Sequence, residues 1–185
     1  MILEQAIAVS YRRGTVDDVE ALAEISRLTY LETFGDGSDG QSPEETAAYL
    51  RSAFSSEKTH EELLGEANHF LLAETRDKVV GYAKLNGDCE VPKCIEQDAP
   101  VQLQRIYVLS EFHGKGPGSV LMRSALAEAE RQGYDAVWLG VDRNNLRAQE
   151  FYKKWDFIEV GEHTFSTDTI TYTDLIFSRS LEGVP

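Results

Sequence analysis

A strand-like segment that runs into a glycine-rich loop and then into an amphipathic helix is the feature that most restricts the fold of this chain. Apolar and polar side chains alternate over Val101–Leu109, and the helical pattern covers Ser119–Arg131. Between them, glycine occupies every second position of Gly114–Gly118. Glycine lets a backbone close around an anion, and the first N–H groups of a helix carry partial positive charge. The segment therefore predicts a phosphate-binding loop in an α/β domain.

This loop fits neither of the common nucleotide-binding fingerprints. A Walker loop needs Gly-Lys-Ser/Thr after four intervening residues, and a dinucleotide-binding fold places its glycines after the first strand. Here Lys115 is followed by Gly116, and the loop follows a middle strand. A glycine-rich turn without a ligand is the alternative interpretation at this point.

The periodicity of apolar residues predicts a mixed α/β domain over residues 1–185. We expect about seven strands, antiparallel on the N-terminal side and parallel around the glycine loop, with flanking helices. In chain order, the expected elements are a strand at 9–13, helices at 15–32, 43–54 and 56–66, strands at 69–75, 78–86 and 101–109, a helix at 119–131, a strand at 136–141, a helix at 145–155 and strands at 157–164 and 169–179.

The net charge of the chain excludes some partners. Its 185 residues carry 32 acidic and 18 basic side chains, a formal net charge of -14, and 42% of them are hydrophobic, which is too many for a disordered acidic chain. A chain this acidic offers little positive charge to phosphate backbones or anionic membranes, so we expect no nucleic-acid or membrane binding. Residues 1–100 hold 20 of the acidic and 9 of the basic side chains. This asymmetry indicates either a cationic ligand or an unevenly charged surface.

Targeting and metal-binding signals are missing from the sequence. The first residues do not resemble a signal peptide, and no apolar run approaches the roughly 20 residues that span a bilayer. We therefore expect a soluble, cytoplasmic protein. Cys89 and Cys94 lack a second pair of Cys or His residues to complete a zinc site, so we expect loop thiols and no metal.

Two motifs in this order resemble those of the GNAT superfamily of N-acetyltransferases. Ile106–Val108 followed by His113–Gly118 resembles motif A, whose pattern is Gln/Arg-x-x-Gly-x-Gly/Ala. Val141–Phe157 resembles motif B. Segments over almost the whole chain, including Leu28–Phe34 and Val80–Asn86, are similar to bacterial spermidine/spermine N-acetyltransferases of the PaiA type.

The resemblance implies a mixed sheet of GNAT type with acetyl-CoA bound in the splay between two parallel middle strands. The backbone of Ile106, Tyr107 and Val108 would then line the pantetheine arm. Asn145 and Lys154 match further cofactor contacts, although a helix cap and a solvated lysine would also explain these two residue types. The residues expected to wrap the pyrophosphate are His113, Gly114, Lys115, Gly116, Pro117, Gly118 and Ser119.

Tyr152 is the expected catalytic residue. When an amine attacks the thioester, CoA leaves as a thiolate, and a phenol near the sulfur can donate a proton to it. A core tyrosine beside Phe151 is the alternative. Related enzymes often place Glu on the strand before the loop, but Gln102 and Gln104 stand there and cannot accept a proton. We therefore expect a water chain to Glu32, Glu111 or a backbone carbonyl.

The acceptor expected from the resemblance is a polyamine such as spermidine or spermine. Glu32 would hold its cation and Tyr30 and Phe34 would flank its methylene groups, although Glu32 would also serve as a solvated helix residue. A protein N-terminus, a lysine or another small amine is the nearer alternative, and a CoA-binding regulator without turnover is the more distant one. His113 replaces the usual Gln or Arg, and Asp156 replaces a common Gly. A homodimer is a further expectation, since dimers are common in the resembled family.

Overall fold

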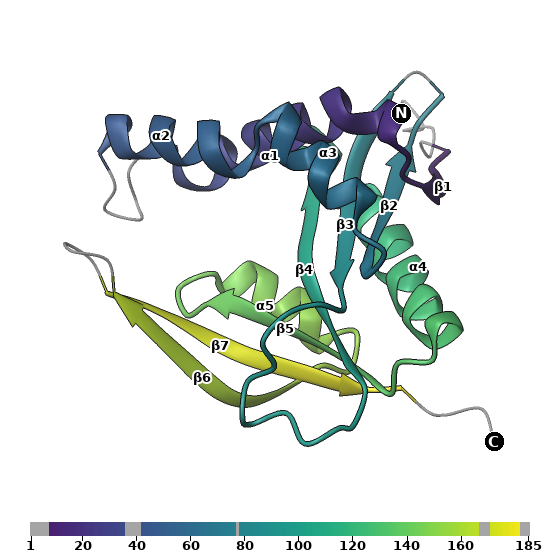
Figure 1. The fold of residues 1–185 in the computed structure, drawn as a ribbon, viewed down its shortest axis with the longest axis vertical. Coiled ribbons are helices and arrows are strands. Elements are labelled where there is room, and N and C mark those ends of the chain that lie inside the picture. Colours follow the sequence, from purple (N-terminus) through teal and green to yellow (C-terminus); the bar gives the residue numbers. More distant parts are fainter. Residues whose placement is uncertain (1–7, 36–41, 77, 167–170, 182–185) are drawn as a thin grey trace, which may run out of the picture. The chain divides into compact units, whose positions relative to one another are not determined.

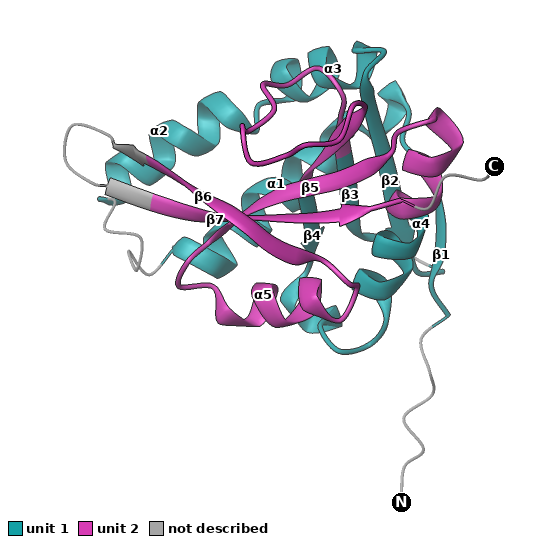
Figure 2. Cartoon of the chain, turned by 90° about the horizontal axis from the view of Figure 1, so that it is seen from below, with its two compact units in different colours: residues 1–84, 105–124 teal, residues 85–104, 125–185 magenta. Residues whose placement is uncertain are grey.

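The structure, a computed structural model, describes residues 8–35, 42–76, 78–166 and 171–181. The described strands form a seven-stranded mixed sheet in the order β1-β2-β3-β4-β5-β7-β6 (Figure 1). The chain divides into two compact units, residues 1–84 with 105–124 and residues 85–104 with 125–185 (Figure 2). The sheet, with its parallel pair β4 and β5 and its flanking helices, confirms the predicted α/β class. The prediction of a single domain stays a prediction.

The first unit contains the N-terminal helices, the early strands and the glycine loop. Its helix α1 packs against α3, and α3 packs against β2. The elements are β1 (Ser10–Arg13), η1 (Val16–Asp18), α1 (Val19–Phe34), α2 (Pro43–Ala53), α3 (Ser56–Leu64), β2 (Asn68–Glu74), most of β3 (Val79–Asn86), the last residues of β4 (Pro100–Val108), η2 (Ser110–Phe112) and the first half of α4 (Pro117–Gln132).

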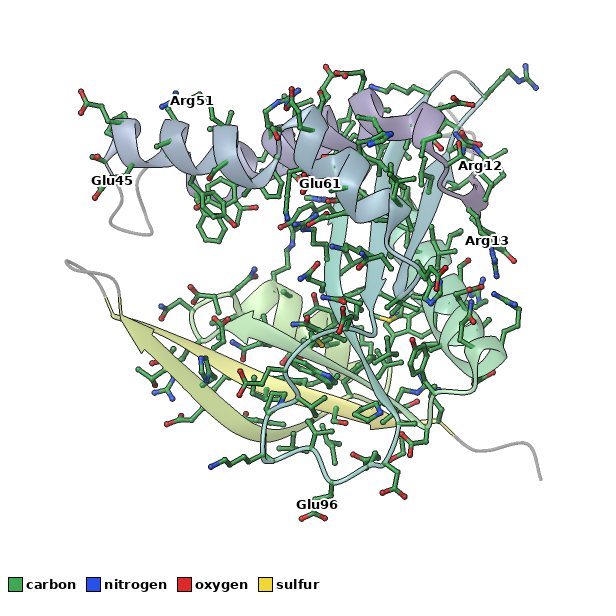
Figure 3. The ribbon with its side chains drawn as sticks, viewed as in Figure 1. Arg12, Arg13, Glu45, Arg51, Glu61 and Glu96 are labelled. Carbon is green, nitrogen blue, oxygen red and sulfur yellow. The ribbon has the colours of Figure 1, made fainter. Side chains whose placement is uncertain are left out.

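Ionic contacts and caps fix where these helices begin. Arg12 donates to both carboxylate oxygens of Asp18 at 2.7 and 2.6 Å, and the hydrogen bond from Arg12 lowers the pKa of that carboxyl group. Arg12, labelled in Figure 3, also donates to Glu74 at 2.9 Å, so its two ion pairs connect β1 with η1 and β2. Ser42 caps α2, with Pro43 in the first helical position as predicted.

The apolar core of the first unit lies between α1 and the sheet. Leu22 and Ile25 of α1 form one cluster with Phe70, Leu72 and Tyr82 of the strands. The Tyr82 hydroxyl lies 2.7 Å from the Ser26 hydroxyl, so the phenol is buried with a hydrogen-bond partner.

The second unit contains the later strands. Its elements are the first residues of β4, the second half of α4, β5 (Ala136–Asp142), α5 (Leu146–Lys153), β6 (Ile158–Ser166) and β7 (Thr171–Ser180). In the parallel ladder, Pro100–Gln102 of β4 pairs with Ala136–Trp138 of β5. Strand β7 pairs antiparallel with both β5 and β6. The last strand predicted from sequence, 169–179, starts at two residues outside the described part.

The segment between β3 and β4 contributes to the core of the second unit. Cys89, Cys94 and Ile95 pack against Trp138 and Ile176. A side chain at Gly161 would place its Cβ 2.8 Å from the Cys94 sulfur, and the β6–β7 register shifts beside it. Both cysteines are free thiols in the structure.

Candidate functional site

The glycine loop of the first unit has a backbone that glycine makes possible. Gly114 has φ of 74° and Gly116 has φ of 107°, a left-handed region that other residues adopt at a cost. No atom lies within 4 Å of a Cβ built at either position, so backbone conformation rather than space selects glycine there. Pro117 is the first residue of α4, where its missing N–H has no intrahelical acceptor to lose. The predicted strand–loop–helix unit is confirmed in this respect.

His113 anchors the loop to the end of β4. Its Nε2 lies 2.7 Å from the Val108 carbonyl oxygen, to which it donates. The Nε2–H is therefore engaged with the backbone of the protein itself. The ring therefore fixes the start of the loop. The role of His113 in cofactor binding stays a prediction.

Glu32 holds the turn that precedes the loop. Its carboxylate accepts the Ser110 N–H at 3.0 Å and the Ser110 hydroxyl at 2.7 Å. Tyr30 and Phe34, one helical turn apart on α1, instead contact each other as tilted rings with centroids 4.9 Å apart. The structure therefore brings Tyr30 and Phe34 together and directs Glu32 elsewhere. The pairing of Glu32 with Ser110 was missed from sequence because 78 residues separate them.

Tyr30 and Phe34 form the outer part of a longer series of aromatic rings within the first unit. Tyr30 lies 4.9 Å from Tyr49 and 6.0 Å from Phe54. Phe54 in turn lies 6.4 Å from Tyr107. Tyr30 and Phe34 are half-buried and Tyr49 is 43% exposed, so a ligand can reach this end of the series. Tyr49 was missed from sequence because it lies on a different helix, α2.

A buried ionic cluster lies at the inner end of the aromatic series. Arg105 donates to both oxygens of Glu62 at 2.7 and 3.1 Å, and Lys84 Nζ lies 3.1 Å from the same carboxylate. Burial raises the pKa of Glu62, but the hydrogen bond and charge of Arg105 and the charge of Lys84 outweigh it, so that pKa is lowered. Burial lowers the pKa of Lys84 to about 8. Arg105 also lies over the Phe54 ring, at 5.2 Å.

Replacing Lys84 with Met is expected to remove a rise in stability at alkaline pH. The pKa of Lys84 falls from 10.5 to about 8 on folding, so the unfolded chain binds more protons between these values. The contribution of Lys84 to the free energy of unfolding therefore increases as the pH rises from about 8 to 10.5. Urea unfolding over that range should show the increase in the wild type and in the exposed-site control Lys93→Met, but not in Lys84→Met. Parallel pH curves for all three proteins would contradict the assignment.

In the second unit, the predicted residues of motif B lie on and around α5. Asn145 is its N-cap, with the side-chain oxygen accepting the Ala148 N–H at 3.1 Å. Lys154 follows the last helical residue and is exposed. Asp156 has φ of 60°, so it keeps the left-handed conformation for which glycine is common at this point.

Tyr152 lies among aromatic rings of the second unit. Its ring is 5.7 Å from Phe151 and 6.0 Å from Phe157. Burial raises the pKa of its phenol, so the hydroxyl stays protonated at neutral pH. A protonated phenol can donate to a developing thiolate, and a packed aromatic position fixes its orientation.

The described part of the chain contains no group of three or more His, Cys, Asp or Glu side chains that could hold a metal ion. Among the helices in the described ranges, none has the length and apolar character needed to cross a membrane.

The predicted cofactor residues are divided between the two units. Those of β4 and the glycine loop belong to the first unit, and those on and around α5 belong to the second.

The comparisons with known proteins identify the class. The profile of the Acetyltransferase (GNAT) family matches residues 22–157. An uncharacterized N-acetyltransferase of Mycobacterium tuberculosis is 35% identical over 140 residues, which are 75% of this chain and 84% of that protein. The chain belongs to the GNAT family of acetyltransferases. It is an acetyl-CoA-dependent N-acetyltransferase, which confirms the predicted enzyme class and cosubstrate.

Solved structures share the fold. The PaiA N-acetyltransferase of Thermoplasma acidophilum, in complex with coenzyme A, has a TM-score of 0.72 at 22% identity, covering 95% of this chain and 100% of that one. The ribosomal-protein-S18-alanine N-acetyltransferase of Escherichia coli has a TM-score of 0.67 at 16% identity, covering 96% of this chain and 97% of that one. This likeness confirms the predicted GNAT-type sheet, while the PaiA type stays a prediction.

Proposed function

We propose that this N-acetyltransferase transfers acetyl from acetyl-CoA to a primary amine of a polyamine such as spermidine or spermine. The observation that carries the proposal is the reachable group of three rings, Tyr30, Phe34 and Tyr49, within the first unit. Aromatic faces attract ammonium groups, and their apolar surface suits the methylene chains between them. The inner rings are less suited, because Arg105 already lies over Phe54.

The charge of the chain supports a cationic acceptor. Residues 1–100, which supply α1 and α2, carry 20 acidic and 9 basic side chains, whereas residues 101–185 carry 12 and 9. An acidic surface raises the local concentration of a polycation and speeds its association. Glu32 contributes to this field, although its carboxylate oxygens hold Ser110.

The proposed cosubstrate contacts follow the two motifs. The exposed backbone of the loop, opened by Gly114 and Gly116 and followed by the N-terminus of α4, suits the pyrophosphate. Lys115 adds a positive charge. Asn145 and Lys154 of the second unit are assigned as further contacts to the cofactor. The backbone of Ile106–Val108 is assigned to the pantetheine arm.

The proposed chemistry is direct transfer. The amine nitrogen attacks the thioester carbonyl carbon, the C–N bond forms and the C–S bond breaks. Tyr152 donates its phenolic proton to the departing CoA sulfur and regains one from the reacting nitrogen. No covalent enzyme intermediate is needed. We also propose a cytoplasmic location and a homodimer, as expected from the sequence.

A protein N-terminus is the second candidate acceptor. One structural neighbour carries the name ribosomal-protein-S18-alanine N-acetyltransferase, and the fold alone is compatible with either acceptor. A CoA-binding protein without turnover is the third candidate. The acceptor therefore has to be tested directly.

The test is acetyl-CoA turnover, followed by thiol release, with a panel of amines. Spermidine and spermine should be preferred over free amino acids and over a peptide with N-terminal alanine. Tyr49→Ala should raise the KM for spermidine about threefold to tenfold, the loss expected from one cation–π contact. Tyr11→Ala, an exposed tyrosine on β1, is the matched control and should leave this KM unchanged. If the enzyme prefers the alanine peptide, the acceptor is a protein N-terminus and not a polyamine. If the protein binds CoA but releases no thiol with any amine, it is a CoA-binding regulator.

A further inference from the structure

Three titratable side chains form a row across neighbouring strands of the second unit. Asp174 of β7 pairs with Asp142 of β5 on one side and with His163 of β6 on the other. Directly paired residues of antiparallel strands project to the same face, with their Cβ atoms about 4.5–5.5 Å apart. Asp174 therefore lies between a carboxylate and an imidazole. The predicted mechanism uses none of these residues.

Asp174 lies in an environment that disfavours its charged form. Burial raises the pKa of this carboxyl group, the charge of Asp142 raises it further, and His163 acts in the opposite direction. The next charged neighbours, Arg143 and Glu162, form an ion pair with each other. A carboxylate held in this way takes up a proton more readily than an ordinary surface carboxylate.

The Asp174 carboxylate packs against the backbone of Gly140. Gly140 precedes Asp142 by two residues on β5 and is exposed. A Cβ at Gly140 would lie 3.3 Å from the Asp174 Oδ2 atom. The carboxylate therefore lies over a position that has no side chain, and Asp174 is half-buried rather than enclosed.

The row lies at the end of β5 where a ligand is expected. Ligands of open α/β sheets bind at the carboxyl ends of the parallel strands, and Asp142 is the last residue of β5. Its Oδ1 accepts the Asn144 N–H at 2.6 Å, next to the α5 cap Asn145. Asp174 therefore lies across the ladder from the strand end that leads into the α5 cap.

The reaction needs a proton acceptor that the sequence does not reveal. A primary amine with a pKa near 10 arrives as an ammonium ion and must lose a proton before it attacks. Gln102 and Gln104 cannot accept it. Glu32 is held by Ser110, and Glu111 accepts from Lys78 at 2.8 Å. Asp174 is half-buried and has a titratable neighbour in His163, its partner on β6.

We propose that Asp174 is the proton acceptor of the acetyl transfer and that His163 passes the proton on to solvent. The inference rests on the proposed transfer of acetyl to an amine. One proton moves from the ammonium nitrogen to an Asp174 oxygen, and the freed lone pair attacks the thioester carbon. A second proton leaves the nitrogen after the C–N bond forms and replaces the one that Tyr152 gives to the CoA sulfur. The products are the N-acetyl amine, CoA thiol and one released proton.

Asp174→Asn tests the proton transfer. With the panel amine of highest kcat/KM as probe, kcat should fall about 100-fold at neutral pH. The loss should shrink as pH approaches the pKa of the amine, because more of the amine then arrives unprotonated. CoA affinity by calorimetry should stay within about twofold. The melting temperature at neutral pH should hold or rise, because the variant removes a carboxylate whose pKa is raised on folding.

The two neighbours of Asp174 provide matched controls with opposite signs. Asp142→Asn keeps the acceptor for the Asn144 N–H and removes a negative charge, so the acidic limb of the kcat/KM profile should move to lower pH. His163→Gln removes the electrostatic effect that lowers the pKa of Asp174, so the same acidic limb should move to higher pH. A purely structural role of Asp174 would not produce two shifts of opposite sign.

Three outcomes would overturn the inference. The first is an Asp174→Asn enzyme with kcat within about twofold of wild type. The second is a loss of activity that is equally large at every pH. The third is an acidic limb that neither neighbouring substitution moves. If the wild type acetylates no amine in the panel, it is the proposed function that fails. Asp174 can then still be titrated by NMR in the wild type, and an ordinary pKa there would end this inference as well.

Discussion

Tyr152→Phe is expected to lower kcat by about 100-fold to 1,000-fold while leaving the KM for acetyl-CoA within about twofold. The substitution removes one oxygen atom and keeps the ring that packs on Phe151 and Phe157. Burial raises the pKa of the Tyr152 phenol, so the wild-type group is protonated at working pH and available to the departing thiolate. The loss should therefore appear in the chemical step and not in cosubstrate binding.

Steady-state kinetics and calorimetry with CoA check this result. Tyr11→Phe removes a hydroxyl from an exposed tyrosine of β1 and is the control, expected to leave kcat unchanged. A second acyl donor with a leaving thiol of lower pKa should reduce the defect of Tyr152→Phe, because a better leaving group needs less protonation. If kcat stayed near wild type, Tyr152 would be a packing residue, the alternative that the Phe151–Tyr152 pair suggested.

Glu62→Ala is expected to reduce the free energy of unfolding by about 3–5 kcal/mol. The substitution leaves Lys84 and Arg105 in the interior of the first unit without the carboxylate that both contact. Leaving a buried charge without its partner is among the largest effects of a single substitution. Denaturant unfolding should show a lower midpoint with a nearly unchanged slope.

The neighbouring Glu61→Ala is the matched control for Glu62→Ala. Glu61, labelled in Figure 3, is 70% exposed and lies 3.6 Å from Lys58, so its removal should change stability little. The pH dependence gives a second check. The pKa of Glu62 is lowered on folding, so its contribution is present above the ordinary value and lost as pH falls through the folded value. The two variants should converge at acid pH, and a constant difference would contradict the ionic role.

Local patterns in the sequence predicted the parts of the candidate site that depend on neighbouring residues. The glycine-rich turn between a strand and a helix is a property of a few consecutive residues, and Gly114 and Gly116 adopt positive φ values there. The Asn145 cap is of the same kind. These features follow from backbone preferences, which is why a strand–loop–helix unit could be predicted before its structure was known.

Contacts between distant segments could not be predicted in the same way. Glu62, Lys84 and Arg105 come from a helix and two strands, and each looks like an ordinary surface residue in its own segment. The position of Asp174 beside Asp142 depends on the register of β7 with β5. Helical geometry could have predicted one feature. Residues two apart on a helix point in different directions, so Glu32 cannot share a face with Tyr30 and Phe34, which are four apart.

The anchors of the glycine loop also bear on the entropy of cosubstrate binding. A segment with two left-handed glycines has many conformations when unfolded, and fixing them on an anion would weaken its binding. Glu32 fixes Ser110, His113 fixes the end of β4, and Pro117 restricts the first residue of α4. The ordering of this segment is therefore largely completed when the protein folds, and under the proposed assignment a pyrophosphate would bind a loop whose shape already exists.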